Sequence, residues 1–182
     1  PGLYPEFHMF LQALGSCAAL CLAWRRLARR TWPTAGARAW IALGLGLFFA
    51  ALGIAVNVLR RGEQTPTAKI WTVIATVAPL VLATISFFFF GNYGFDLKHG
   101  LFAIVLALAY LGAAHVAFRD PEYEGGYVFS RDLLIAASFA SLIYALIVMT
   151  NDATTTIGAA LVGFVYLLAQ RVRNWPVLPW AM

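Results

Sequence analysis

The sequence predicts an all-α integral membrane protein, a bundle of six transmembrane helices joined by short loops. The first observation is composition: of 182 residues, 62% are hydrophobic and 12% are charged, whereas soluble domains average roughly 45–50% and 25%. The second is that apolar residues occur in uncharged runs of about 20, the length that crosses a hydrocarbon core of about 30 Å. Runs such as Leu101–Ala114 do not alternate in polarity, which favours helices over a barrel.

A single transmembrane domain is predicted to occupy residues 1–182. In order, the expected spans cover residues 7–24, 39–59, 70–90, 99–118, 132–150 and 154–169. The first span resembles a retained helix, because the basic residues that would precede the apolar core of a signal peptide follow it here. Residues 170–182 contain two prolines and are too short to span, so we predict an interfacial tail.

Polar residues just before the apolar runs predict where helices begin. Asp96 precedes the fourth span, and Ser130 and Asp132 stand at the start of the fifth. Asn151 or Asp152 precedes the sixth. Such side chains accept hydrogen bonds from the free amides of a first helical turn, so we expect them to be caps.

The basic residues predict an orientation. With six spans both termini share one face, and the 13 Lys and Arg residues divide six to seven between the faces. Because the densest cluster follows the first span, we expect the Arg25–Arg38 loop inside and the N-terminus outside. The membrane would be a bacterial or organellar inner membrane. Basic residues at helix ends reach lipid head groups, so we expect membrane lipids as partners and no nucleic acid.

Small residues at helical spacing predict which helix faces meet protein, because in lipid close backbone approach drives association. We expect packing faces at Ala42, Gly46, Ala50 and Gly53 on the second span, and at Ala137, Ser141 and Ala145 on the fifth. Pro79 lies within the third span, where it leaves the carbonyl of Ala75 without an amide donor and predicts a kink.

Two histidines form the candidate cofactor site. His8 and His115 fall on the same face of the membrane, each near a helix end, and could hold a haem or a quinone. Diheme membrane cytochromes resemble this arrangement, but they need a second histidine for each haem, and the chain offers none for His99. Cys17 and Cys21, four residues apart on one helix, are expected to be packing residues, so no metal site is predicted.

No motif in the sequence indicates catalysis, so no catalytic residues are expected. The spans carry no charge at their centres, which argues against an ion-coupled pump. We therefore expect a non-catalytic subunit of a larger, energy-converting membrane complex, with other membrane subunits as partners. One alternative is a small-solute transporter or its substrate-binding subunit, since the size is similar to that of the substrate-capturing membrane subunits of vitamin importers. The other is a haem- or quinone-linked redox subunit.

Overall fold

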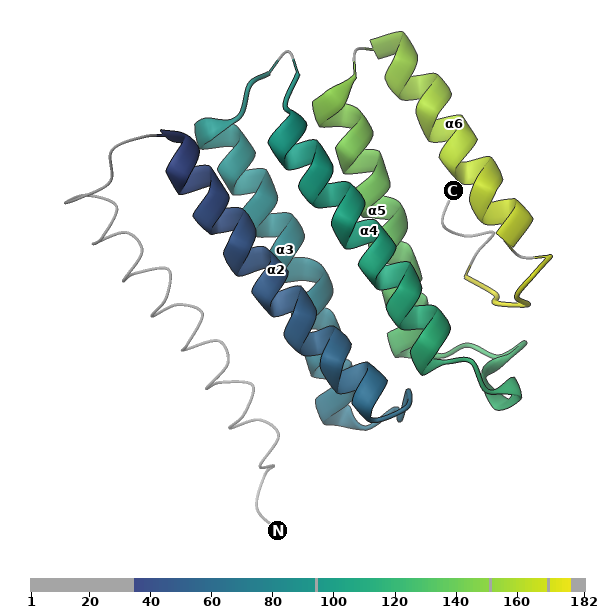
Figure 1. Ribbon diagram of the computed structural model, residues 1–182. Coiled ribbons are helices and arrows are strands. Elements are labelled where there is room, and N and C mark those ends of the chain that lie inside the picture. Colours follow the sequence, from purple (N-terminus) through teal and green to yellow (C-terminus); the bar gives the residue numbers. More distant parts are fainter. Residues whose placement is uncertain (1–34, 94, 151, 170, 178–182) are drawn as a thin grey trace.

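The computed structural model describes residues 35–93, 95–150, 152–169 and 171–177. All regular structure within these residues is helical, and consecutive helices run up and down (Figure 1). The five α-helices are α2 (Ala35–Leu59), α3 (Pro66–Phe90), α4 (Leu97–Ala117), α5 (Phe129–Met149) and α6 (Asp152–Ala169). A short 3-10 helix, η1 (Pro121–Tyr123), lies in the connection between α4 and α5.

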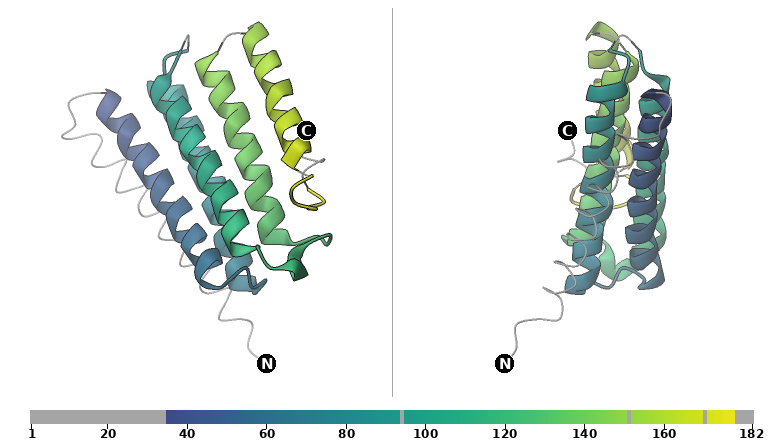
Figure 2. Two further views of the ribbon diagram at one scale, coloured as in Figure 1. Left: turned by 45° about the vertical axis from the view of Figure 1, so that its right-hand side comes forward. Right: turned by 90° about the vertical axis from the view of Figure 1, so that its left-hand side faces the viewer.

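The helices α2 to α5 form a four-helix bundle. α2 packs along α3, and α4 packs along α5; the two pairs meet through α2 with α4 and α3 with α5. The view turned by 90° shows two layers, one with α2 and α4 and one with α3 and α5, and α6 lies at one side of the bundle beyond α5 (Figure 1 and Figure 2). Among the described helices, α6 therefore packs mainly against α5.

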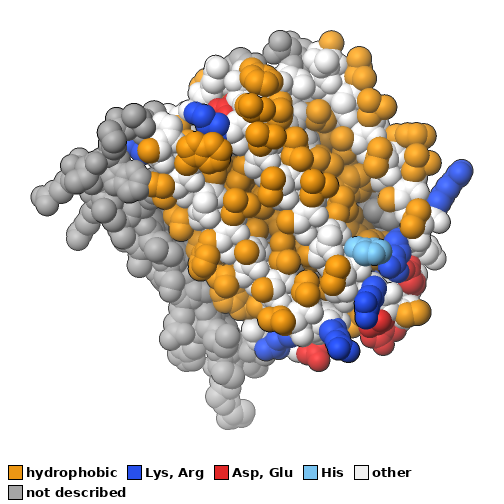
Figure 3. All heavy atoms as spheres, viewed as in Figure 1, with side chains coloured by type: hydrophobic (Ala, Val, Ile, Leu, Met, Phe, Trp, Pro, Cys, Tyr) orange, Lys and Arg blue, Asp and Glu red, His pale blue; other side chains and the backbone are white. Residues whose placement is uncertain are grey.

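The prediction of six membrane spans is borne out for four of them. α2, α3, α4 and α5 are long and apolar enough to cross a membrane. The fifth described helix, α6, is shorter: its 18 residues reach about 27 Å, slightly less than a hydrocarbon core of about 30 Å. The predicted first span, residues 7–24, lies outside the described residues. Figure 3 shows an apolar belt, with charged side chains gathered towards the two ends of the helices.

The α2–α3 interface is built from small residues. The buried positions of α2 are Ala39, Leu43, Gly46, Ala50, Gly53 and Asn57. They alternate in spacing between four and three, the repeat of left-handed helix pairs. At Gly53 the backbones approach so closely that a Cβ atom would lie 2.3 Å from Cβ of Ala75. Gly46, Ala50 and Gly53 thus lie in the interface, while Ala42 is half-buried at its margin.

The α4–α5 interface uses small residues from both helices. Ala137, Ser141 and Ala145 of α5 are all buried. On α4 the matching face contains alanines that the sequence analysis did not select: Ala103, Ala107, Ala113, Ala114 and Ala117. α4 has the most buried apolar span of the four, because α2 and α5 both cover it.

Candidate functional site: buried polar joints between the helices

Polar side chains inside the described bundle fall into three groups. One group surrounds His99 at the end of the bundle where α3 is joined to α4. A second surrounds Arg131 at the opposite end, where α5 begins. Between them, single hydrogen bonds join neighbouring helices. The buried polar and charged residues are Asn57, Thr72, Thr76, Ser86, Asp96, His99, Ser130, Arg131, Asp132, Ser138 and Ser141.

Asp96 organises the first group and is the predicted cap of α4. Its Oδ1 atom accepts hydrogen bonds from the amides of Lys98 (3.0 Å) and His99 (3.1 Å), and its Oδ2 atom accepts one from the amide of Asn92 (2.9 Å). Its own amide donates to the carbonyl of Val148 on α5 (2.8 Å). Burial raises the pKa of the Asp96 carboxyl, but the amide donors of Asn92 and His99 outweigh it and hold that pKa below its ordinary value.

His99 joins Asp96 to α3. Its Nδ1 atom lies 3.0 Å from Oδ2 of Asp96, and its Nε2 atom lies 3.0 Å from Oγ of Ser86. The imidazole is fully buried, and the ring of Phe87 packs edge-on against it at 5.5 Å between centroids. The ring therefore ties the first turn of α4 to the last turns of α3.

The order Asp96, His99, Ser86 is that of a hydrolase triad, in which the imidazole takes the proton of the serine hydroxyl. A triad also needs a serine that substrate can reach and donors for the oxyanion. Only 1% of the Ser86 surface is exposed, and Ser86 projects from a helix within the bundle. With this burial the three side chains hold the ends of α3 and α4 together, and Ser86 cannot receive an acyl substrate.

Arg131 organises the second group and is completely buried. Its guanidinium forms an ion pair with the neighbouring Asp132 (2.6 Å) and donates to the carbonyls of Tyr123 and Gly126, at 2.6 Å for the latter. Asp132 also accepts a hydrogen bond from the amide of Val128 (2.9 Å), the residue that precedes α5. The expectation that Ser130 caps this helix is wrong, because its buried hydroxyl has no hydrogen-bond partner in the described structure.

The C-terminal segment 171–177 closes over this group. The ring of Trp175 is buried between two guanidinium groups, those of Arg131 and Arg173, at 5.5 and 5.6 Å from the ring centroid. Arg173 also forms an ion pair with Glu124 (2.9 Å). The sequence analysis placed Trp175 in a tail at the membrane interface; its burial against protein comes from these cation–π contacts.

The remaining polar contacts join neighbouring helices at separate points along the bundle. Asn57 of α2 donates to Thr72 of α3 (2.8 Å), and Tyr144 of α5 donates to the carbonyl of Ala83 on α3 (3.0 Å). Ser138 of α5 and Tyr166 of α6 share a short hydrogen bond. In each pair a polar group of one helix forms a hydrogen bond with the neighbouring helix, which replaces a hydrogen bond to water inside the bundle.

Tyr110 satisfies the carbonyl that Pro79 leaves open. α3 continues as one helix from Pro66 to Phe90 through Pro79. Since proline has no amide hydrogen, the carbonyl of Ala75 lacks its donor from the next turn. The hydroxyl of Tyr110 on α4 donates to that carbonyl at 2.5 Å. The kink at Pro79 stays a prediction, but its hydrogen-bond consequence is visible.

The predicted cofactor ligands do not come together within the described residues. His8 lies outside them. His115 is exposed near the end of α4 and makes no hydrogen bond or ion pair with the residues that the structure describes. Among those residues, no group of three or more His, Cys, Asp or Glu side chains could hold a metal ion.

Sequence reasoning missed two important residues of these joints, Arg131 and Trp175. The adjacency of Arg131 to Asp132 was a visible signal, but burial of the pair depends on a segment some forty residues further along the chain. The spacing of Asp96 and His99, one helical turn apart, was the signal for the other joint.

Comparison of the chain with models of known protein families, with curated proteins and with solved structures found no match.

Proposed function

We propose that this chain is a non-catalytic integral membrane subunit of a larger membrane complex, with energy-converting complexes as the first class to examine. The supporting observation is that buried polar side chains such as Asn57, His99 and Arg131 bond to neighbouring helices and helix ends. Groups used in this way hold the bundle together. Within the part of the chain that the structure describes, they do not converge on an open site where a substrate could be held.

The outer surface supports the same proposal. Large apolar side chains cover the outside of the described helices, as a membrane requires. α6 differs from the other described helices because, among them, it packs extensively against α5 alone. Its exposed side chains include Leu161 and Phe164. We therefore expect the neighbouring subunit to meet the bundle along α6.

A site-specific photo-crosslinking experiment tests this proposal. A photoreactive amino acid replaces Phe164 on α6 in the full chain, in membranes of the source organism. The control replaces Val81 of α3, which is about as exposed. We expect one defined protein adduct from position 164 and none from position 81. Lipid adducts alone at both positions, together with a monodisperse and thermostable monomer in detergent, would contradict the proposal.

A redox subunit is the second candidate, and the state of His115 favours it. The imidazole is exposed and makes no hydrogen bond or ion pair with the described residues. Its nitrogens are therefore available to bind a haem iron as an axial ligand or to form a hydrogen bond with a quinone oxygen. His8 would be the second ligand. The absorbance spectrum of the protein purified from native membranes tests the haem version. A Soret band that is lost in His115→Ala supports it, and its absence from the wild-type protein excludes it.

A further inference from the structure

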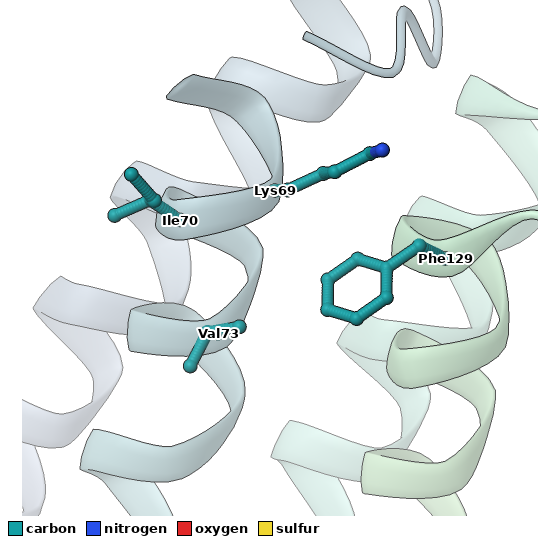
Figure 4. A pocket seen from close by; sticks show the side chains of 4 residues that line it. All are labelled: Lys69, Ile70, Val73 and Phe129. Atoms are coloured by element: carbon teal, nitrogen blue, oxygen red, sulfur yellow. The ribbon is translucent and has the colours of Figure 1, made fainter. Parts of the chain in front are cut away.

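A shallow groove lies between α3 and α5 at the end of the bundle where both helices begin. Its volume is about 240 Å³, and it is lined by Lys69, Ile70 and Val73 of α3 and by Phe129 of α5 (Figure 4). Figure 4 shows the Lys69 side chain and the Phe129 ring extending into the space between the two helices. The groove thus combines apolar walls with a single cationic group.

The position of the groove relates it to the membrane surface. α3 and α5 are both candidate spans, and Lys69 lies in the first turn of α3, while Phe129 is the first residue of α5. A lysine at this depth extends its ammonium towards the head groups and leaves its methylenes among acyl chains. Within the described residues this ammonium has no hydrogen-bond or ion-pair partner, although it stands beside apolar side chains.

The dimensions argue for part of a lipid as the occupant. Pockets that enclose small organic ligands measure roughly 300–1,000 Å³ and bury most of the ligand. This groove is smaller and lies open at the surface, so it fits a stretch of one acyl chain whose remainder stays in the bilayer. A negatively charged phosphate at the head-group level would supply the partner that Lys69 lacks.

We propose that this groove is a binding site for one anionic phospholipid. An acyl chain packs against Ile70, Val73 and Phe129, and the lipid phosphate accepts hydrogen bonds from the ammonium of Lys69. Apolar contact alone would hold any phospholipid, whereas the charge of Lys69 selects a lipid with a net negative head group over a zwitterionic one. The proposal concerns lipid recognition and is independent of whether the chain belongs to a larger complex.

Native mass spectrometry of the full chain in detergent, with equal amounts of phosphatidylglycerol and phosphatidylcholine, tests the site. We expect phosphatidylglycerol to be the retained lipid. A lysine near the surface contributes about 1 kcal/mol towards anionic lipid, so Lys69→Ala should weaken its retention about five-fold while phosphatidylcholine stays unchanged. Lys69→Arg should preserve the preference, and Val73→Trp, which fills the groove, should reduce both lipids.

Lys98→Ala is the matched control, because Lys98 is an exposed lysine in the first turn of α4 at the other end of the bundle. Equal losses in Lys69→Ala and Lys98→Ala would mean that the preference is a general effect of positive charge, and would overturn the proposal. Unchanged retention of both lipids in Val73→Trp would also overturn it, by showing that bound lipid lies elsewhere. Circular dichroism of each variant confirms that its helices are intact.

Discussion

The hydroxyl of Tyr110 provides a residue-scale test of how a proline is accommodated inside a membrane helix. It donates to the carbonyl of Ala75, which Pro79 deprives of its own donor. Tyr110→Phe leaves that carbonyl buried without a partner, so we expect a loss of about 1–2 kcal/mol in unfolding free energy. Titration with a denaturing detergent, followed by circular dichroism, measures it.

The control for this prediction restores the missing donor. In Pro79→Ala, the amide of residue 79 can donate to the carbonyl of Ala75 as in an uninterrupted helix. Tyr110→Phe should then lower the unfolding free energy clearly less in the Pro79→Ala background than in the wild type. Equal losses of unfolding free energy in the two backgrounds would show that the hydroxyl acts on something other than this carbonyl.

The carboxylate of Asp96 gives the second residue-scale prediction. Its pKa is lowered in the folded protein from an ordinary value of 3.8, so its contribution to stability is present above that pH. This contribution disappears as the pH falls through the lowered pKa. Thermal unfolding of wild type and Asp96→Asn between pH 6 and pH 3 measures the difference. The wild type should have the higher unfolding temperature at pH 6, and the difference between the two proteins should narrow below pH 4. A difference that does not change with pH would contradict the stabilising role of the Asp96 carboxylate.

At the scale of the elements, sequence reasoning located the ends of the helices better than their beginnings. The predicted last residues of the described spans, 59, 90, 118, 150 and 169, agree with the structure to within one position. The predicted beginnings are two to four residues late. In α3, for example, Thr65 accepts a hydrogen bond from the amide of Ala68, and Pro66 occupies the first turn. Such polar or constrained residues begin a helix without being apolar, so a hydropathy pattern excludes them.

The close contact of α2 with α3 gives an element-scale prediction. A Cβ atom at Gly53 would lie 2.3 Å from Cβ of Ala75 and 2.6 Å from the carbonyl oxygen of Trp71. Gly53→Ala must push the two helices apart, and overpacking of this kind costs about 1–3 kcal/mol. Gly44→Ala is the control, because nothing lies within 4 Å of its added methyl group. It should be neutral or slightly stabilising in the same detergent titration, and equal losses in both variants would contradict the packing argument.

At the scale of the whole molecule, the all-helical class and four of the expected spans followed from composition and hydropathy. The buried polar contacts around His99 and Arg131 could not be predicted in this way, for a physical reason. Small residues such as Gly46 and Ala137 mark a helix face because close approach requires them. The burial of Arg131 depends on Trp175, a contact between segments that no local pattern connects. Likewise, the unusual environment of His99 requires Ser86 from another helix.

The up-and-down arrangement makes a prediction about orientation. Asn92 lies in the α3–α4 connection and Tyr127 in the α4–α5 connection, at opposite ends of the bundle, and both are exposed. With Cys17 and Cys21 replaced by serine, single cysteines at positions 92 and 127 should react with a membrane-impermeant maleimide from opposite sides. We expect position 127 to react from outside and position 92 from the cytoplasmic, matrix or stromal side. The reverse pattern would reject the orientation, and labelling of both from one side would reject the topology.

The bond between Tyr110 and Ala75 also bears on how the chain enters its membrane. Helices are released into lipid in the order of their synthesis, and the hydroxyl that completes α3 lies on the segment made after it. Until that segment arrives, α3 exposes an unsatisfied oxygen to hydrocarbon, which is unfavourable by several kcal/mol. The third helix should therefore stay beside the insertion machinery until the fourth has emerged, so that the two leave together as a pair.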